Sequence, residues 1–289
     1  MHIFDHIIFY WLGRFLAVHL PLKLSYLLAI VISDLHYIFA KVDRANVTAN
    51  LKNIFPEKNR QDIARLRIRL FRNFAKYLVD FLRFSKIDMG YIKGNIRIEN
   101  RHFIDAALSK GRGVIVLSAH IGNWELGGVI TAMLGYQISA VALPHKDKGV
   151  DNFFNFQRER KGLNVIPLGK AARQCLNILN GNKIIAIAGD RDFSRNGILL
   201  DFFGKPAIFP EGPAAFSLKT QAPIVPAFTI RNKDDSFTLR FEEPIELKPE
   251  GDREKDIKAL IFKYKIIFEN YIRKYPEQWY MFKKFCVER

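Results

Sequence analysis

From Ile96 onward, short runs of β-branched residues and leucine alternate with helical segments, and this alternation limits the fold more than any other feature. The expected strands are 96–99, 114–117, 138–143, 165–167, 184–188, 223–228 and 237–241. Parallel strands buried on both faces form continuous apolar runs, and crossover helices join them. The sequence therefore predicts an α/β fold, with a mostly parallel central sheet flanked by helices.

A polar cluster follows the central strand, 114–117, beginning with His120. Sites in open α/β sheets form outside the carboxyl ends of strands, so this histidine lies where chemistry is expected. Asn123 is the expected N-cap of the next helix, and Glu125 in its first turn can fold back toward the imidazole. A carboxylate on one ring nitrogen leaves the other free as a base. The alternative is that both residues only shape a strand–helix turn.

Two further polar clusters lie at comparable places. The strand 184–188 ends in Gly-Asp190-Arg191-Asp, and a Pro-Glu211-Gly212-Pro loop precedes another helix, whose free amides could face an anion. The alternative is that Glu211 has only a structural role, as the N-cap residue of that helix. The candidates for binding an acceptor or stabilising an oxyanion are Asn123, Asp190, Arg191, Glu211 and Gly212.

Residues 1–42 are the most apolar part of the chain, divided by Pro21. The apolar run is interrupted by Asp5, Arg14, Lys23 and Asp34. Because spanning a bilayer takes about 20 mostly apolar residues, we predict two helices that lie on or dip into a membrane. A single short span and a buried helical hairpin are the alternatives. A signal peptide is not expected, since no basic region precedes the run and no small-residue cleavage site follows.

The remainder, 43–289, is predicted to be the α/β domain, with an amphipathic helical lead-in over 43–90 and a basic C-terminal helix. The chain carries 45 Lys and Arg against 29 Asp and Glu, a net charge of +16. Such a charge indicates a polyanionic partner: nucleic acid, an anionic membrane or a phosphorylated substrate. The 25 phenylalanines favour a lipid interface over nucleic acid. Two cysteines without metal spacing indicate a reducing compartment.

Several motifs occur in a characteristic order. They are Asn50-Leu-Lys-Asn-Ile-Phe-Pro56, Ser-Ala-His120-Ile-Gly-Asn-Trp-Glu125, Gly-Asp190-Arg191-Asp-Phe, Phe-Phe203-Gly204-Lys-Pro, Gly212-Pro213-Ala and Ala-Pro223-Ile-Val-Pro226. With them, the chain resembles the bacterial lipid A biosynthesis (late) acyltransferases, a group that includes phosphatidylinositol-mannoside acyltransferases. Glycerolipid acyltransferases are more distant relatives. Pro-Glu211-Gly is closer to their Pro-Glu-Gly than to the Pro-Thr-Gly of the lipid A branch, which leaves the acceptor open.

The resemblance implies a membrane-associated O-acyltransferase with a glycerolipid-acyltransferase-like sheet. A fatty acyl thioester on acyl carrier protein or coenzyme A would be the donor, and a glycolipid or phospholipid hydroxyl the acceptor. Within the His-x4-Glu motif, His120 would be the general base and Glu125 would orient it. Arg191 and the amides near Gly122 and Asn123 are candidates for the oxyanion site. Asp190 would either contact the acceptor or assist His120. The resemblance implies no metal and no cofactor beyond the thioester co-substrate. It also implies the cytoplasmic face of the inner membrane, with peripheral or single-span attachment.

Two other function classes remain open from the sequence. The first is an acyl-thioester hydrolase that uses the same base with water, although Ser118 lacks a Gly-x-Ser-x-Gly context. The second is a non-enzymatic binder of anionic membranes or nucleic acid. Polar clusters at two strand ends, which a simple binding module does not need, argue against this second class. We therefore expect an enzyme without a nucleic-acid partner.

Overall fold

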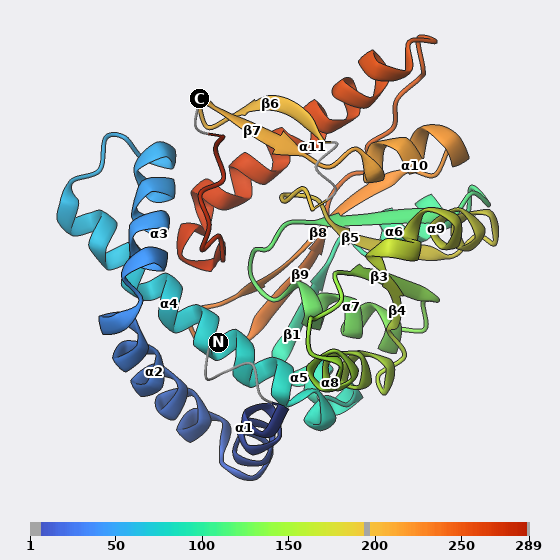
Figure 1. Cartoon of the computed structure of the whole chain (residues 1–289). Coiled ribbons are helices and arrows are strands. Elements are labelled where there is room, and N and C mark those ends of the chain that lie inside the picture. The colour runs from blue at the N-terminus through green and yellow to red at the C-terminus, as the bar shows by residue number, and fades with distance from the viewer. Residues whose placement is uncertain (1–6, 194–196, 288–289) are drawn as a thin grey trace.

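A mostly parallel sheet forms the centre of the computed structural model, which describes residues 7–193 and 197–287 (Figure 1). Its strand order is β1-β9-β8-β2-β5-β3-β4, and every neighbouring pair is parallel except β8 and β9. The strands are β1 (Ile96–Glu99), β2 (Val114–Ser118), β3 (Ile138–Ala142), β4 (Asn164–Pro167), β5 (Ile184–Ala188), β8 (Ile224–Arg231) and β9 (Phe237–Phe241). The predicted fold class is confirmed.

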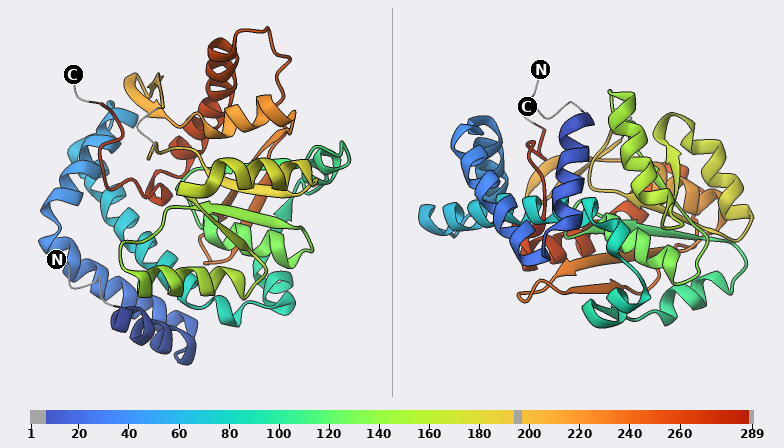
Figure 2. Two further views of the ribbon diagram at one scale, coloured as in Figure 1. Left: turned by 45° about the vertical axis from the view of Figure 1, so that its right-hand side comes forward. Right: turned by 90° about the horizontal axis from the view of Figure 1, so that it is seen from below.

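Helices cover both faces of this sheet (Figure 2). They are α6 (His102–Leu108), α7 (Trp124–Met133), α8 (Lys148–Glu159), α9 (Ala171–Asn180), α10 (Gly212–Thr220) and α11 (Arg253–Lys274). Alternate residues of a strand point to opposite faces, and β2 shows the consequence. Ile115 and Leu117 belong to the apolar core under α9, α10 and α11, whereas Val114 and Val116 belong to the core under α6 and α7.

The segment 198–209 departs from the sequence prediction. None of the predicted strands lies there, but β6 (Ile198–Phe202) and β7 (Lys205–Phe209) pair as an antiparallel hairpin. Its two turn residues, Phe203 and Gly204, have φ angles of 54° and 75°. Two consecutive positive φ angles match the right-handed twist of the flanking strands, so the turn closes a hairpin.

The N-terminal helices form an arm beside the sheet: α1 (Ile7–His19), α2 (Leu22–Phe39), α3 (Lys41–Ile54) and α4 (Arg60–Leu82), followed by α5 (Met89–Asn95). α2 packs along α4, and α4 also contacts α7. α2 is long and apolar enough to cross a membrane by length and composition alone. Its 18 residues rise about 27 Å, close to the ~30 Å of a bilayer core. The division of the chain at residue 42 stays a prediction.

Candidate active site

His120 and Asp190 meet because the two strands that precede them are neighbours in the sheet. In the parallel register of β2 and β5, Ser118 lies opposite Ala188, and each side chain of interest comes two residues later. The imidazole Nδ1 is 2.6 Å from Oδ1 of Asp190. The Asp190 side chain is fully buried, whereas 16% of the His120 side chain is exposed. The register therefore places a histidine–carboxylate pair at the carboxyl edge of the sheet, with part of the imidazole accessible.

The C-terminal segment completes this pair. The indole Nε1 of Trp279 donates a hydrogen bond of 2.9 Å to the second carboxylate oxygen of Asp190. The backbone N–H of Tyr280 donates to the carbonyl of His120 at 2.9 Å. Neither residue was predicted from the sequence, since both lie about 90 positions beyond Asp190 and carry no local motif. Each oxygen of Asp190 thus has its own donor, which holds the carboxylate in one orientation.

The pKa of Asp190 is set by two opposing effects. Burial alone would raise it, but the charge and hydrogen bond of His120, the charge of Arg191 and the Trp279 hydrogen bond outweigh burial. The net result is a pKa well below the ordinary aspartate value. Asp190 therefore stays ionised and can keep the Nδ1 proton of His120 in place. That arrangement leaves Nε2 as the proton acceptor.

Glu125 occupies a different position from the one expected. Both of its oxygens accept from the guanidinium of Arg158 in α8, with Nε at 2.8 Å and Nη2 at 2.6 Å. The two side chains are only 10% and 9% exposed. Burial would lower the pKa of Arg158, but the Glu125 carboxylate raises it above the ordinary arginine value. The carboxylate that contacts Nδ1 of His120 therefore belongs to Asp190. Glu125 instead links α7 to α8 through its ion pair with Arg158.

The amides near Gly122 and Asn123 are already engaged. The N–H of Gly122 donates to the Gln278 carbonyl at 2.9 Å, and the N–H of Asn123 donates to the Thr229 carbonyl at 2.7 Å. The Asn123 side chain caps α7 by accepting from the N–H of Leu126 at 3.0 Å. These residues shape the loop that carries His120. Because the backbone N–H groups of Gly122 and Asn123 both donate to carbonyls of the protein, neither is free to donate to an oxyanion.

Arg191 retains a free donor beside the pair. Its Nη2 donates to the carbonyl of Tyr280, while its buried Nε lacks a hydrogen-bond partner among the described residues. Burial lowers the pKa of Arg191, and the neighbouring Asp190 opposes that effect. A buried cationic N–H without a protein acceptor is suited to an oxyanion.

Glu211 and Gly212 lie at the start of α10. Within the described residues, the Glu211 side chain makes no capping hydrogen bond, and its carboxylate lies 3.7 Å from Nη2 of Arg253. Glu211 is therefore the N-cap residue of α10 by position, without a side-chain capping bond. In the described parts of the chain, no hydrogen bond or ion pair joins either residue to His120.

The chain belongs to the bacterial lipid A biosynthesis acyltransferase family, which it matches over residues 3–285. It is therefore an O-acyltransferase, as the motifs predicted. The phosphatidylinositol mannoside acyltransferase of Mycolicibacterium smegmatis is 27% identical over 214 residues, covering 72% of this chain and 68% of the relative. That of Mycobacterium tuberculosis H37Rv is 32% identical over 127 residues, or 43% of this chain and 40% of the relative.

Two other comparisons are more remote. The lipid A biosynthesis acyltransferase of Haemophilus influenzae is 21% identical over 243 residues, covering 83% of this chain and 74% of the relative. The crystal structure of the 1-acyl-sn-glycerophosphate acyltransferase PlsC from Thermotoga maritima aligns with a TM-score of 0.40 at 16% identity. That alignment covers 86% of this chain and 97% of PlsC.

Proposed function

We propose that this protein moves a fatty acyl chain from an acyl thioester, on acyl carrier protein or coenzyme A, to a hydroxyl of a membrane glycolipid or phospholipid. The relatives named for phosphatidylinositol mannoside and lipid A support a glycolipid acceptor. The single observation that carries the chemistry is the His120–Asp190 pair, with Nδ1 held at 2.6 Å from a buried carboxylate. The proposal requires no metal and no cofactor beyond the thioester.

The reaction follows from the tautomer that Asp190 sets. Nε2 of His120 takes the proton of the acceptor hydroxyl, whose oxygen then attacks the thioester carbonyl carbon. The carbon–sulfur bond breaks, and the departing thiolate receives the proton from the imidazolium. One ester forms and one thiol is released, without an acyl-enzyme. Arg191 stabilises the oxyanion through its unpartnered Nε, and Glu211 and Gly212 contact the acceptor head group.

Membrane attachment is the second part of the proposal. The side chains that α2 turns inward include Ser25, Tyr26 and Ser33, whereas its large apolar side chains face outward. This arrangement reverses that of a water-exposed amphipathic helix. We call the exposed set the N-terminal apolar face: Ile8, Phe9, Trp11, Leu12, Phe15, Leu24, Leu27, Leu28, Val31, Ile32, Leu35, Ile38, Phe39 and Val42.

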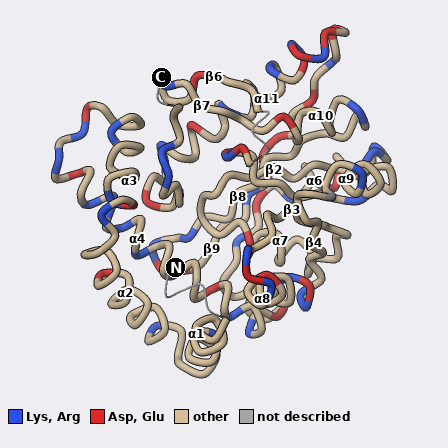
Figure 3. Tube along the Cα trace, in the orientation of Figure 1, with Lys and Arg blue, Asp and Glu red and all other residues tan. Residues whose placement is uncertain are grey.

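The N-terminal apolar face suits a bilayer surface better than a span. Asp34 of α2 forms a two-bond ion pair with Arg72 of α4, at 2.9 and 2.7 Å, and the charged helix α4 lies along α2. Figure 3 shows long uncharged stretches on α1 and α2 and many cationic positions elsewhere on the chain. Since the cytoplasmic leaflet is anionic, the +16 charge favours peripheral binding on that face.

The acyl-transfer proposal is tested with purified full-length protein, acyl-coenzyme A or acyl carrier protein, and a bacterial lipid extract as acceptor. Mass spectrometry should show one lipid class gaining one acyl chain. His120→Ala should slow this product by about 10²- to 10⁴-fold, the usual contribution of a general base. Unchanged acylation by a folded His120→Ala variant would overturn the mechanism. Equal thioester loss with and without lipid would instead identify a hydrolase.

The membrane proposal is tested by cosedimentation with vesicles of phosphatidylcholine and phosphatidylglycerol. Leu27 and Leu35 are each 57% exposed on α2, so changing both to aspartate should abolish the binding that survives high salt. Met89→Asp is the control, because Met89 is exposed on α5, outside the N-terminal apolar face. Equal sedimentation of both variants would remove the attachment proposal.

A further inference from the structure

A buried polar network joins α2 to the residue that begins the helix after His120. The Tyr26 hydroxyl of α2 donates to Oδ1 of Asp80 in α4, at 2.5 Å. The other carboxylate oxygen of Asp80 accepts from Nδ2 of Asn123 at 3.0 Å. Asn123 lies three residues after His120 and caps α7. One carboxylate therefore connects a helix of the N-terminal apolar face to the loop that carries the base.

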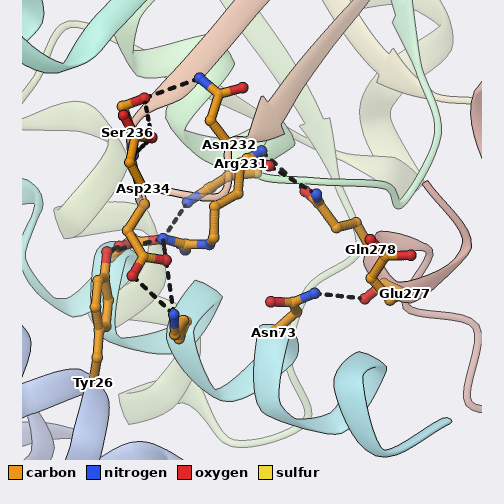
Figure 4. A network of polar contacts seen from close by, with 12 residues as sticks. Tyr26, Asn73, Arg231, Asn232, Asp234, Ser236, Glu277 and Gln278 are labelled. Atoms are coloured by element: carbon orange, nitrogen blue, oxygen red, sulfur yellow. Dashed lines mark hydrogen bonds and ion pairs between the residues drawn. The ribbon is translucent and has the colours of Figure 1, made fainter. Parts of the chain in front are cut away.

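Arg231 of β8 completes the network. It donates to Asp80 through Nη2 and to the Tyr26 hydroxyl at 3.0 Å through Nη1. Figure 4 shows Tyr26 and Gln278 approaching Arg231 from different sides. Gln278 exchanges two hydrogen bonds with the backbone of Arg231, at 3.0 and 2.9 Å, and its carbonyl accepts from Gly122. The loop after His120 is thus bound to the same network at two points, through the Gly122–Gln278 and Asn123–Asp80 hydrogen bonds.

Net stability is a weak explanation for this arrangement. Tyr26, Asp80, Asn123 and Arg231 are all buried. Buried ion pairs contribute little net stability, because the cost of removing charges from water offsets their attraction. They do fix geometry, since the charges tolerate few arrangements. The network is therefore better explained by the position it imposes on Asn123 than by the free energy it contributes.

We propose that Asp80 and Asn123 are positioning residues for His120, and that Tyr26 makes their geometry depend on the seating of α2 at a bilayer. This inference rests on the membrane part of the proposed function. Lipid contact along the N-terminal apolar face restricts rotation of α2 about its axis, and Tyr26 lies on the inward side. A fixed Tyr26 holds Asp80, and Asp80 holds Asn123 and the loop in which His120 meets Asp190.

α2 offers a matched control for this link. The hydroxyl of Tyr37 accepts a 2.7 Å hydrogen bond from Nε of Arg67 in α4. Tyr26→Phe and Tyr37→Phe therefore each remove one hydroxyl that joins α2 to α4, but only Tyr26 leads to Asn123. Phenylalanine at position 26 preserves the ring beneath Lys76 and Arg231. Asn123→Ser breaks the link from the other end, because serine still caps a helix but lacks the amide donor.

The three tryptophans of the chain report on both ends of the link. Trp11 lies on the N-terminal apolar face and is 46% exposed. The centroid of the Trp124 ring lies 5.0 Å from that of the His120 ring, and Trp279 is hydrogen-bonded to Asp190. The full chain labelled with 5-fluorotryptophan is examined by ¹⁹F NMR with and without bicelles of phosphatidylcholine and phosphatidylglycerol. Single Trp→Phe variants assign the three resonances.

In the unsubstituted protein, we expect bicelles to shift all three resonances. Tyr26→Phe and Asn123→Ser should keep the Trp11 shift, which shows a folded and bound protein, and lose the Trp124 and Trp279 shifts. Tyr37→Phe should keep all three. Should Tyr26→Phe fail to fold, Asn123→Ser decides the question.

Three results would overturn the proposal. An unresponsive Trp11 in the unsubstituted protein removes the bilayer contact, and the proposed attachment fails with it. A responsive Trp11 with unmoved Trp124 and Trp279 removes the coupling alone. Shifts of Trp124 and Trp279 that persist in Tyr26→Phe and Asn123→Ser show that lipid reaches the site by another route.

Discussion

Two amide substitutions identify the carboxylate that orients His120. Asp190→Asn and Glu125→Gln each remove one charge and nearly preserve size. Asp190 accepts from two donors, Nδ1 of His120 at 2.6 Å and the indole of Trp279 at 2.9 Å. Asparagine has one acceptor oxygen, and the indole can only donate, so we expect the oxygen to stay with Trp279. The amide NH₂ then faces Nδ1 and moves the imidazole proton to Nε2, where it blocks the base.

The expected magnitudes separate the two carboxylates. An imidazole held in the wrong tautomer costs about 10⁴-fold in serine proteases, and loss of a general base costs about 10²- to 10⁴-fold. Asp190→Asn should therefore lower kcat by about 10²- to 10⁴-fold. Glu125→Gln instead leaves the Arg158 charge buried without its partner, a loss of about 3–5 kcal/mol. For a chain of this size, we expect Tm to fall by roughly 10 °C and kcat of the folded enzyme to stay within about tenfold.

Initial rates of acyl transfer, measured by mass spectrometry well below both values of Tm, provide the assay. In the double variant, Asp190→Asn added to His120→Ala should cost little more than His120→Ala alone, because the two residues act as one unit. A Glu125→Gln variant with unchanged Tm and a 10²-fold or larger loss of kcat would refute this reasoning and return the orienting role to Glu125.

Three further outcomes are expected. Gly122→Ala should lower both Tm and kcat, because φ is 63° and the added Cβ would lie 2.1 Å from the carbonyl oxygen of Thr229; unchanged melting and rate would contradict the tight loop. Glu211→Ala should raise KM for the lipid acceptor and leave Tm nearly unchanged, since Glu211 makes no capping bond; steady-state kinetics and melting curves decide between binding and stability. Because folding lowers the pKa of Asp190, its ionised form stabilises the protein fully above the unfolded value of about 3.9. The difference in unfolding free energy between the unsubstituted protein and Asp190→Asn should therefore shrink as acid titration proceeds below that pH, and a constant difference would contradict the lowered pKa.

The sheet could be predicted from sequence because its strands are buried on both faces. Val114 to Leu117 and Ile184 to Ala188 have no polar position that would suit a solvent-facing strand, and both form parallel strands. The hairpin of β6 and β7 was not predicted, because Phe-Phe203-Gly204-Lys is not one of the Asn-Gly or Asp-Gly turn sequences that identify a hairpin from sequence. β8 continues to Arg231, beyond the predicted end at 228, since its last residues pair with β9.

The partners of the site residues could not be predicted in the same way. His120 and Asp190 were both placed at strand ends, but their contact depends on β2 and β5 being neighbours, which local sequence does not encode. The short spacing between His120 and Glu125 suggested a pair, yet spacing does not set the direction of a side chain on the first turn of α7. Arg158 and Trp279 come from distant segments whose positions depend on the whole topology.

The burial of the pair also bears on the choice between transfer and hydrolysis. A base open to bulk water would deliver water to the thioester as readily as it delivers a lipid hydroxyl. Only 16% of the His120 side chain is exposed, the Trp124 ring lies against its ring, and the Asp190 side chain is fully buried. This burial restricts a lipid hydroxyl at least as much as it restricts water, so the acceptor depends on which hydroxyl is concentrated at the site. The proposed seating of the N-terminal apolar face on a bilayer would concentrate lipid hydroxyls there. The proposed attachment therefore favours acyl transfer to a lipid over thioester hydrolysis.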